Sequence, residues 1–214
     1  MISIIIPACN EEKYIKNTIN SVKQQNFKDY EIIVVCDGCT DKTSKITKRL
    51  TRKTIILNQR SGPAVAKNEG AKLAKYDKFV FLDADTLLTE NSLQSMSDAI
   101  DNKLYGTCKI KPSSNKLKHK FMMFLKNFCP LPFTNGIIFC HRDNFNKING
   151  FPSLKKGEDG KFVRKLSKYA KFTVLDNYVI SSTRRFDNKG YLSVGIYWIK
   201  EYFKPSNEDY EVIR

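Results

Sequence analysis

The first hundred residues alternate between continuous apolar runs and segments in which apolar positions recur every three or four residues. Runs rich in Ile and Val occupy 2–7, 31–35 and 54–58, and a fourth run begins at residue 78. Runs of this length predict buried strands, whereas the segments between them have the spacing of amphipathic helices. Apolar strands that alternate with helices are typical of an α/β fold with a mostly parallel central sheet, flanked by helices on both faces.

Helices are expected after each of the first three strands. In the first helix, over residues 11–25, Ile15 and Ile19 lie on one face, and Asn10 is placed to cap the start. The second helix is rich in lysine. The third is built on small residues and begins near Pro63, a residue that suits a first helical turn.

The fourth apolar run ends in two carboxylates, Asp83 and Asp85. In an extended chain, residues i and i+2 point to the same side, so these carboxylates are expected to crowd each other and to need a cation. In an open α/β sheet, the ligand lies beyond the carboxyl ends of the strands. The residues that follow the four runs there are Pro7–Glu11, Asp37, Asn58–Gly62 and Asp83–Asp85. They predict a polar ligand site.

The second half of the chain has a less regular pattern. Residues 109–133 are basic and aromatic without a clear strand signal, and 135–145 contain a short apolar strand. A helix is expected behind the Gly-Glu-Asp start at 157–159, with a buried face that runs from Phe162 to Tyr169. No internal repeat or low-complexity linker is present in the sequence, so a single domain with a variable, basic and aromatic C-terminal part is expected.

The net charge is the unusual feature of the composition. Apolar residues at 41% and charged residues at 28% are ordinary for a globular protein, but 37 Lys and Arg stand against 22 Asp and Glu, a net charge of +15. Such an excess favours an anionic partner, which could be nucleic acid, an acidic membrane surface or a phosphorylated small molecule. A solvated lysine-rich surface is the alternative.

No targeting signal follows Met1, and no run approaches the roughly 18 apolar residues that a membrane helix needs. A cytoplasmic location is expected, and a peripheral position on the cytoplasmic membrane face stays open. The six cysteines, without a secretion signal, are expected to be free thiols.

Six segments of the chain, in order, resemble the motifs of family 2 glycosyltransferases with the GT-A fold. They are "SIIIPACNEEKYIKNTINSV", "EIIVVCDGCTDKT", "AVAKNEGAKLA", "FVFLDADT", "NGIIFCHRDNFNKINGF" and "GEDGKFVRKL", within residues 2–170. The resemblance implies a single GT-A (Rossmann-like) domain that moves a sugar, with inversion, from a nucleotide-diphosphate sugar to an acceptor hydroxyl or phosphate. It also implies a nucleotide-sugar-binding half (1–106), an acceptor-binding half (107–190) and an aromatic amphipathic tail (191–214).

In this family the Asp-x-Asp motif binds Mn²⁺ or Mg²⁺. The resemblance therefore assigns Asp85 a direct bond to the metal, and Asp83 the ribose or a water-bridged contact to the metal. Hard divalent ions take carboxylate and phosphate oxygens, and as a Lewis acid the ion would stabilise the charge on the leaving diphosphate.

Other positions match the family's donor-binding residues. Asp37 matches an aspartate that reads the base. The remaining matches are Pro7, Ala8, Asn10, Glu11, Arg60, Gly62, Lys67, Ala84, Arg184 and Arg185. Gly62 fits the N-terminal cap of a helix equally well, and family members often carry Arg where Lys67 stands. The two arginines at 184 and 185 are expected to reach the diphosphate or an anionic acceptor.

Glu158 and Asp159 match the family's Glu-Asp pair. Asp159 would be the general base that removes the proton of the acceptor hydroxyl, and Glu158 would orient it or bind the acceptor. A lipid phosphate acceptor is already anionic and would need no base.

The loop after the second strand departs from the family pattern. Cys36 and Cys39 stand where an acid and a serine are usual. This spacing also occurs in thioredoxin-like redox sites, and Cys9 would add a third thiol for a zinc site. The length of the pattern and the Asp-x-Asp motif argue against a redox protein, and no fourth zinc ligand is evident.

The acceptor is expected to be a glycan or a polyprenyl-linked molecule. The Gln-x-x-Arg-Trp motif of processive members is absent, which indicates the addition of one sugar per encounter. The segments 116–128 and 191–203 mix aromatic residues with lysine, so they suit either a lipid interface on an anionic membrane or ordinary core helices.

Two other functions stay open. A nucleotidyltransferase could use a similar sheet and Asp-x-Asp motif, but it would need a basic glycine-rich loop where this chain has "PACNEE". A nucleic-acid-binding protein would suit the charge, but no motif for it is present, so no nucleic acid partner is expected. The intact acids at 37, 83, 85 and 159 argue against a catalytically inactive relative.

Overall fold

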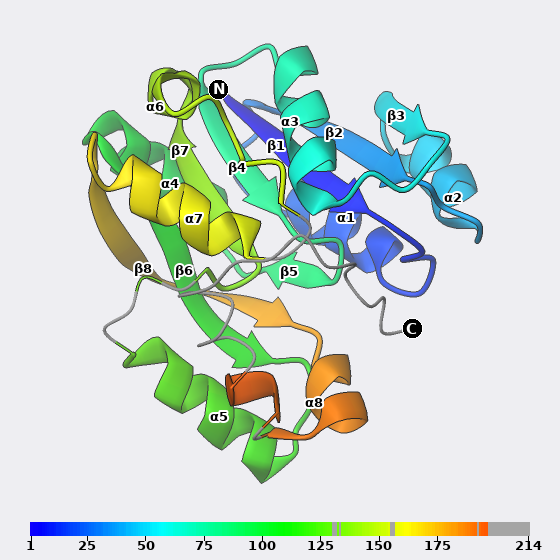
Figure 1. The fold of residues 1–214 in the computed structure, drawn as a ribbon, viewed down its shortest axis with the longest axis vertical. Coiled ribbons are helices and arrows are strands. Elements are labelled where there is room, and N and C mark those ends of the chain that lie inside the picture. Colours follow the sequence, from blue (N-terminus) through cyan, green and yellow to red (C-terminus); the bar gives the residue numbers. More distant parts are fainter. Residues whose placement is uncertain (130–131, 133, 155–156, 192, 197–214) are drawn as a thin grey trace.

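The computed structural model describes residues 1–129, 132, 134–154, 157–191 and 193–196. Its strands are β1 (Ile2–Ala8), β2 (Tyr30–Asp37), β3 (Lys53–Leu57), β4 (Lys78–Leu82), β5 (Thr86–Leu88), β6 (Leu104–Pro112), β7 (Ile137–His141) and β8 (Lys171–Ser181). Its helices are α1 (Ile15–Lys23), α2 (Thr43–Leu50), α3 (Pro63–Leu73), α4 (Ser92–Asp101), α5 (Leu117–Asn127), α6 (Arg142–Lys147), α7 (Glu158–Leu166) and α8 (Arg184–Lys189). The described strands form one sheet in the order β3-β2-β1-β4-β7-β6-β8-β5 (Figure 1).

The expected parallel sheet is confirmed for the first half of the chain and is wrong for the second. Strands β3, β2, β1 and β4 pair in parallel, and each of β1, β2 and β3 is followed by a helix that returns the chain to the end of the sheet where the next strand starts. Strand β7 runs antiparallel to β4 and β6, and β5 runs antiparallel to β8, so the sheet is mixed. These pairings join segments far apart in sequence, which local apolar patterning does not specify.

The sheet is covered on both faces, as expected. Side chains of consecutive strand residues point to opposite faces, so Ile4 and Ile6 join one core cluster and Ile5 joins the other. The first cluster takes its helical residues mainly from α1, α4 and α5, and the second from α3, α6 and α7. In Figure 1, α3, α6 and α7 lie in front of the sheet.

Three local expectations are corrected by the structure. Helix α1 begins at Ile15, and Asn10 is not its cap: Asn10 has a φ of 56°, and its side-chain oxygen accepts from the amide of Thr40 at 2.8 Å. Helix α7 ends at Leu166, so Tyr169 lies beyond it and is exposed. Strand β4 ends at Leu82, so the two aspartates that follow it belong to a turn and not to an extended strand.

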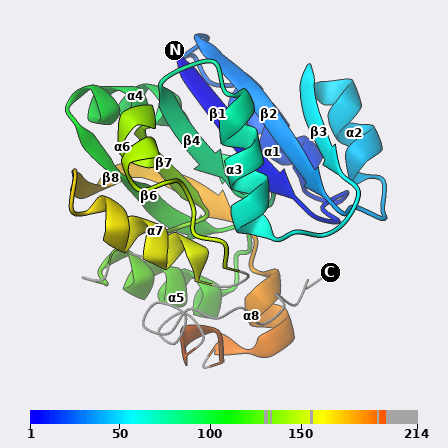
Figure 2. The same ribbon diagram turned by 45° about the horizontal axis from the view of Figure 1, so that its top comes forward.

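Strands β6 and β8 were not predicted, and they build the second half of the sheet. They pair in parallel with a register shift after Cys108. Helices α5 and α8 lie together at one end of the molecule in both views (Figures 1 and 2), where Lys116 forms an ion pair with Asp187 at 2.5 Å. None of the described helices is long and apolar enough to cross a bilayer. Most of the expected aromatic tail at 191–214 lies outside the described residues.

A cluster of phenylalanines fixes α7 against the sheet. Phe151 and Phe162 stack with ring centroids 4.0 Å apart, and Phe81 of β4 meets the Phe151 ring edge-on at 4.8 Å. Such aromatic contacts add to the free energy gained from burial. They hold the start of α7, with its two acids, in a defined position beside the end of β4.

Candidate active site

A cavity of about 300 Å³ lies at the carboxyl ends of β1, β2 and β4. Most of the residues expected at the site line it: Pro7, Ala8, Glu11, Asp37, Arg60, Lys67, Asp83, Ala84, Asp85, Glu158, Asp159, Arg184 and Arg185. Asn10 and Gly62 do not. The fold therefore brings together residues that lie up to 178 positions apart in the sequence, from Pro7 to Arg185.

Lys67 lines the cavity and pairs with both acids at the start of α7. It comes from α3, is 3% exposed, and its Nζ lies 2.5 Å from Asp159 Oδ1 and 3.2 Å from Glu158 Oε1. Burial by itself would lower the pKa of Lys67, but Asp159, Glu158 and Asp83 outweigh burial and raise it. The lysine is therefore charged at neutral pH.

The two acids at the start of α7 have different surroundings. Glu158 is buried, and burial raises its pKa to about 7 against the opposing effect of Lys67. Asp159 pairs with Lys67 through Oδ1, while its Oδ2 accepts from the hydroxyl of Thr134 at 3.3 Å. Lys67 and Thr134 thus fix the orientation of the Asp159 carboxylate at the cavity wall.

Asp83 and Asp85 occupy the turn between β4 and β5. Burial, together with the charges of Asp159 and Asp85, raises the pKa of Asp83 even though Lys67 lies near. The turn therefore carries negative charge that the protein compensates only in part. An additional cation would be stabilised there.

These two aspartates fit a divalent ion by the chemistry of their donor atoms. Carboxylate oxygens are the ligands that Mg²⁺ and Mn²⁺ prefer. No group of three His, Cys, Asp or Glu side chains able to hold a metal occurs among the described residues. The aspartates would supply at most two ligands, and the remaining ones would come from water or from substrate oxygens.

Arg184 connects the first loop to the Asp-x-Asp turn. Its guanidinium donates to both carboxylate oxygens of Glu11, at 2.9 and 2.6 Å, and lies 3.1 Å from Asp85 Oδ2. The same guanidinium stacks on Tyr14, 4.9 Å from the ring centroid. Two parallel bonds of this kind are both strong and directional. Arg184 is the cation that Asp85 meets in this structure.

Asp37 has its carboxylate held by backbone. Its Oδ1 accepts from the amide of Ser61 at 2.7 Å, and its Oδ2 accepts from the amide of Gly62 at 2.8 Å. Gly62 precedes α3 with a φ of 96°, a conformation that favours glycine. The role of Gly62 in this structure is to anchor Asp37 and begin the helix, whereas Asp37 itself lines the cavity.

Several cavity residues were not expected from the sequence. Lys126 of α5 and the loop residues Thr134 and Asn135 also line the cavity. Burial, then the charge of Arg185, lowers the pKa of Lys126 to about 8. Asn135 is 4% exposed, and its side-chain oxygen finds no hydrogen-bond partner within the described part of the chain. An unpaired buried oxygen is costly, so it is suited to accept a hydrogen bond from a ligand.

The cysteines are free thiols, as expected. Cys39 donates to the carbonyl of Ala8 at 3.3 Å, and the sulfur of Cys36 lies 3.4 Å from the hydroxyl oxygen of Thr47. Cys39 thus ties the loop after β2 to the end of β1, and Cys36, within β2, contacts α2. Cys9 lines the cavity.

Comparison with known proteins agrees with this geometry. The family described as Glycosyl transferase family 2 matches residues 3–151. An uncharacterized glycosyltransferase of Haemophilus influenzae is 28% identical over 196 residues, which cover 85% of this chain and 78% of that protein. The GalNAc(5)-diNAcBac-PP-undecaprenol beta-1,3-glucosyltransferase of Campylobacter jejuni is 31% identical over 126 residues, which cover 55% of this chain and 41% of that protein.

A solved structure shares the fold. The mannosyltransferase PcManGT of Pyrobaculum calidifontis, in complex with GDP-Man and Mn²⁺, aligns with a TM-score of 0.74 at 20% identity. The alignment covers 94% of this chain and 62% of that one. This chain thus spans less than two thirds of the Campylobacter and Pyrobaculum proteins.

Proposed function

This chain belongs to glycosyl transferase family 2, and on that premise we propose that it moves one sugar from a nucleotide-diphosphate sugar to an acceptor, with inversion and with the help of Mn²⁺ or Mg²⁺. One observation carries the proposal. A single cavity is lined by two separate pairs of acids, Asp83 with Asp85 and Glu158 with Asp159. An inverting transfer needs both a site for the leaving diphosphate and a base for the acceptor.

Asp159 is the proposed general base. Its Oδ1 is paired with Lys67, and its Oδ2, which accepts a 3.3 Å hydrogen bond from Thr134, is the oxygen that would take the proton. The acceptor oxygen attacks the anomeric carbon as its proton passes to Oδ2. The bond from that carbon to the phosphate oxygen breaks, and the nucleoside diphosphate leaves.

Asp83 and Asp85 are the proposed holders of the divalent ion. When bound, the ion would supply positive charge to offset the charge that grows on the departing diphosphate. Arg184 and Arg185 lie on the same side of the cavity as donors for phosphate oxygens, and Asp37 with Arg60 lines the part of the cavity next to β2 that we assign to the nucleotide.

The acceptor is proposed to be a sugar chain on a polyprenyl diphosphate. The name of the Campylobacter relative specifies such an acceptor. Lys126, which is half-buried, and Asn135, whose buried side-chain oxygen has no hydrogen-bond partner among the described residues, also line the cavity. They suit an acceptor phosphate and an acceptor hydroxyl, respectively.

The first test is thermal unfolding with UDP-, GDP- and dTDP-sugars, each with and without MnCl₂. A ligand at 100 times its dissociation constant stabilises the folded state by about 2.7 kcal/mol, which raises the Tm of a chain of this size by roughly 5–10 °C. We expect one nucleotide to give this shift only with Mn²⁺, and Asp85→Asn to abolish it. Asp143→Asn, an exposed acid on α6, is the matched control and should keep the shift.

Product analysis then separates the enzyme classes. A glycosyltransferase releases a nucleoside diphosphate, whereas a nucleotidyltransferase releases pyrophosphate. The anomeric configuration of the product, read by proton NMR, tests inversion. Wild-type protein that responds to none of the nucleotide sugars, with or without metal, would contradict the proposal.

A further inference from the structure

Helix α5 carries a row of exposed apolar side chains. They are Leu117, Phe121, Phe124, Leu125 and Phe128, which directly follows the helix, and their exposed fractions lie between 47% and 81%. Their spacing of three and four residues places them on one side of the helix. The opposite side is buried through His119 and Met123. We call the five exposed residues the apolar face of α5.

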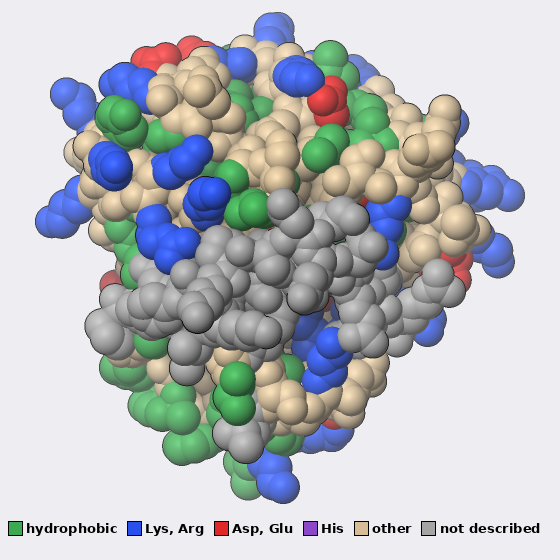
Figure 3. Space-filling model, viewed as in Figure 1, with side chains coloured by type: hydrophobic (Ala, Val, Ile, Leu, Met, Phe, Trp, Pro, Cys, Tyr) green, Lys and Arg blue, Asp and Glu red, His purple; other side chains and the backbone are tan. Residues whose placement is uncertain are grey.

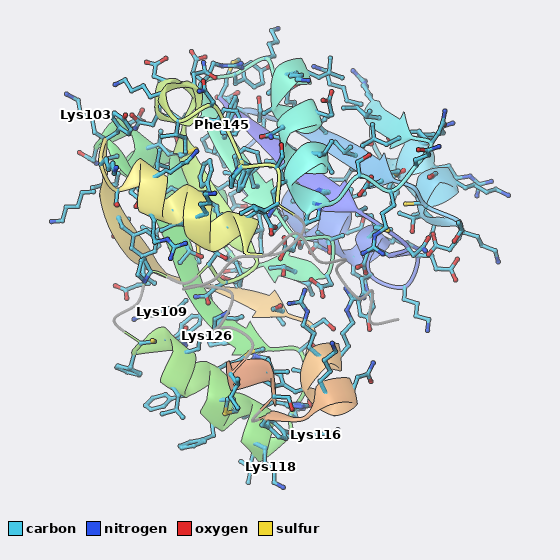
Figure 4. The ribbon with its side chains drawn as sticks, viewed as in Figure 1. Lys103, Lys109, Lys116, Lys118, Lys126 and Phe145 are labelled. Carbon is cyan, nitrogen blue, oxygen red and sulfur yellow. The ribbon has the colours of Figure 1, made fainter. Side chains whose placement is uncertain are left out.

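Lysines flank this apolar face. Lys118 and Lys120 are exposed and lie on either side of it by helical spacing. No Asp or Glu occurs anywhere between residues 102 and 142, although seven lysines do. Figure 3 shows hydrophobic side chains gathered at the lower end of the molecule, where α5 lies in Figure 1, and Figure 4 shows Lys116 and Lys118 at the tip of that end.

We propose that the apolar face of α5 docks on the surface of an anionic lipid bilayer. A helix with large apolar side chains on one side and lysines at the borders of that side lies in the membrane interface, with its apolar side among the acyl chains. The lysine stems reach past the apolar face, and their ammonium groups meet anionic headgroups. The segment 102–142 carries no carboxylate, and Asp187 of α8 is paired with Lys116 beside the face, so little repulsion opposes an anionic surface there.

A second copy of the chain is a poorer occupant of the same face. A two-fold symmetric contact sets the same surface of both copies against each other. The lysines that border the face in one copy would then approach those of the other, and α5 itself carries no carboxylate to pair with them. The charge pattern fits an anionic surface and opposes self-association.

The buried side of α5 connects membrane docking to the cavity, and this connection rests on the proposed function. Met123 and Lys126 line the cavity, while the apolar face points away from it. Docking through α5 would therefore hold the acceptor side of the cavity close to the headgroups. A sugar carried on a membrane lipid could reach Asp159 without leaving the bilayer.

The experiment is co-sedimentation of the full chain with vesicles of phosphatidylcholine containing 30% phosphatidylglycerol, and with phosphatidylcholine alone. We expect binding to the anionic vesicles that weakens as NaCl increases. Phe121→Ser with Phe124→Ser should lower the partition coefficient by at least about tenfold, as should Lys118→Gln with Lys120→Gln.

Two matched controls change the same chemistry elsewhere. Ile56→Ser with Leu73→Ser removes two exposed apolar side chains from β3 and α3, and Lys45→Gln with Lys48→Gln removes two exposed lysines from α2. Both controls should bind the vesicles as wild type does. Equal losses in the controls and in the α5 variants, or no binding of wild type to anionic vesicles, would overturn the proposal.

Sedimentation velocity without vesicles tests the rival occupant. A dimer that the α5 phenylalanine variant dissolves, together with absent vesicle binding, would assign the face to a second copy. The Mn²⁺-dependent thermal shift by a nucleotide sugar should persist in every α5 variant, since none of the changed residues lines the cavity. A failure of docking is therefore distinguishable from a failure of the proposed function.

Discussion

The two acids at the start of α7 are adjacent in sequence but have different surroundings. Asp159 has a close cation and a partly open oxygen, whereas Glu158 is buried, and burial raises its pKa to about 7. Both acids pair with Lys67. Asp159 is suited to accept a proton, and Glu158 is suited to hold Lys67 and Asp159 in position. This difference leads to a prediction about stability and pH.

Glu158 should make the folded state less stable as pH rises from about 4.5 to 7. In this range the unfolded chain has lost the Glu158 proton and the folded chain retains it, so the folded state binds more protons and the free energy of unfolding falls with pH. Glu158→Gln removes this contribution, which we expect to be roughly 1–3 kcal/mol across the range.

Urea unfolding of both proteins at half-unit steps from pH 4.5 to 8 measures the effect. The difference between the free energies of unfolding of wild type and Glu158→Gln should change between pH 4.5 and 7 and be constant above pH 7.5. Glu69→Gln, which removes a carboxylate paired with Lys72 on the surface of α3, is the control and should run parallel to wild type. A parallel curve for Glu158→Gln would show that Glu158 is ionised throughout.

Single residues of the site differ in how far the sequence predicts them. Asp83, Asp85 and Asp159 follow recognisable motifs, and the fold brings them to one cavity. Asn135 begins the segment "NGIIFCHRDNFNKINGF", but the resemblance assigns it no role. Lys126 belongs to no motif, and only the helical spacing of α5 marks it, since it falls on the buried side with Met123. A lysine on the buried side of a helix is a usable signal, but it identifies no partner without the three-dimensional arrangement.

At the scale of elements, β6 holds the Asn135 side of the cavity in place. The carbonyl of Cys108 accepts from the side-chain amide of Asn135 at 2.7 Å, and the hydroxyl of Thr107 accepts from the Asn135 backbone amide at 3.2 Å. Gly106 lies one residue earlier, paired with Thr173 of β8 and Phe139 of β7. The close approach of β8 depends on the missing side chain at Gly106.

Gly106→Ala should therefore weaken the sheet. A Cβ at this position would collide with the carbonyl oxygen of Thr173, a backbone atom that cannot move without disturbing the strand pair. We expect a loss of about 3 kcal/mol or more, at the upper end of overpacking costs, and a fall in Tm of roughly 6–12 °C.

Thermal unfolding followed by circular dichroism measures this change. Gly195→Ala is the matched control, because among the described residues a Cβ there would meet nothing within 4 Å beyond its own local backbone, and its Tm should stay within a degree or two of wild type. An unchanged Tm for Gly106→Ala would mean that β6 and β8 separate at little cost.

Strands β1 to β4 of the first half were predictable, as were β7 and α7 of the second half, but β6 and β8 were not, for a physical reason. Strands β1, β2 and β4 are buried on both faces and read as unbroken apolar runs. Strand β6 contains Gly106 and two lysines, and β8 is largely half-exposed, so neither has that pattern. The antiparallel direction of β7 depends on its pairing with β4, some sixty residues earlier, and no local feature encodes it.

At the scale of the whole molecule, Arg184 connects the two halves of the chain across the cavity. It begins α8 at the end of the second half, and it binds Glu11 and Asp85 of the first half. In the proposed function Asp85 holds a divalent ion. Arg184 and the ion would then compete for the carboxylate of Asp85. Replacing Arg184 should therefore lower the stability of the metal-free protein and raise its affinity for the metal.

Arg184→Gln should lower the free energy of unfolding in metal-free buffer by roughly 1–3 kcal/mol, because the partly buried carboxylate of Glu11 loses its partner. The same change should lower the dissociation constant for Mn²⁺ alone by about threefold or more, since Asp85 is released and a nearby positive charge is removed. Urea unfolding gives the free energy of unfolding, and a thermal-shift titration with MnCl₂ gives the dissociation constant for Mn²⁺.

Arg142→Gln, which removes an ion pair with Asp77 outside the cavity, is the control and should reduce stability without changing the dissociation constant for Mn²⁺. A weaker or unchanged Mn²⁺ affinity in Arg184→Gln would show that Asp85 and the ion do not compete with Arg184, and the metal would have to be placed elsewhere.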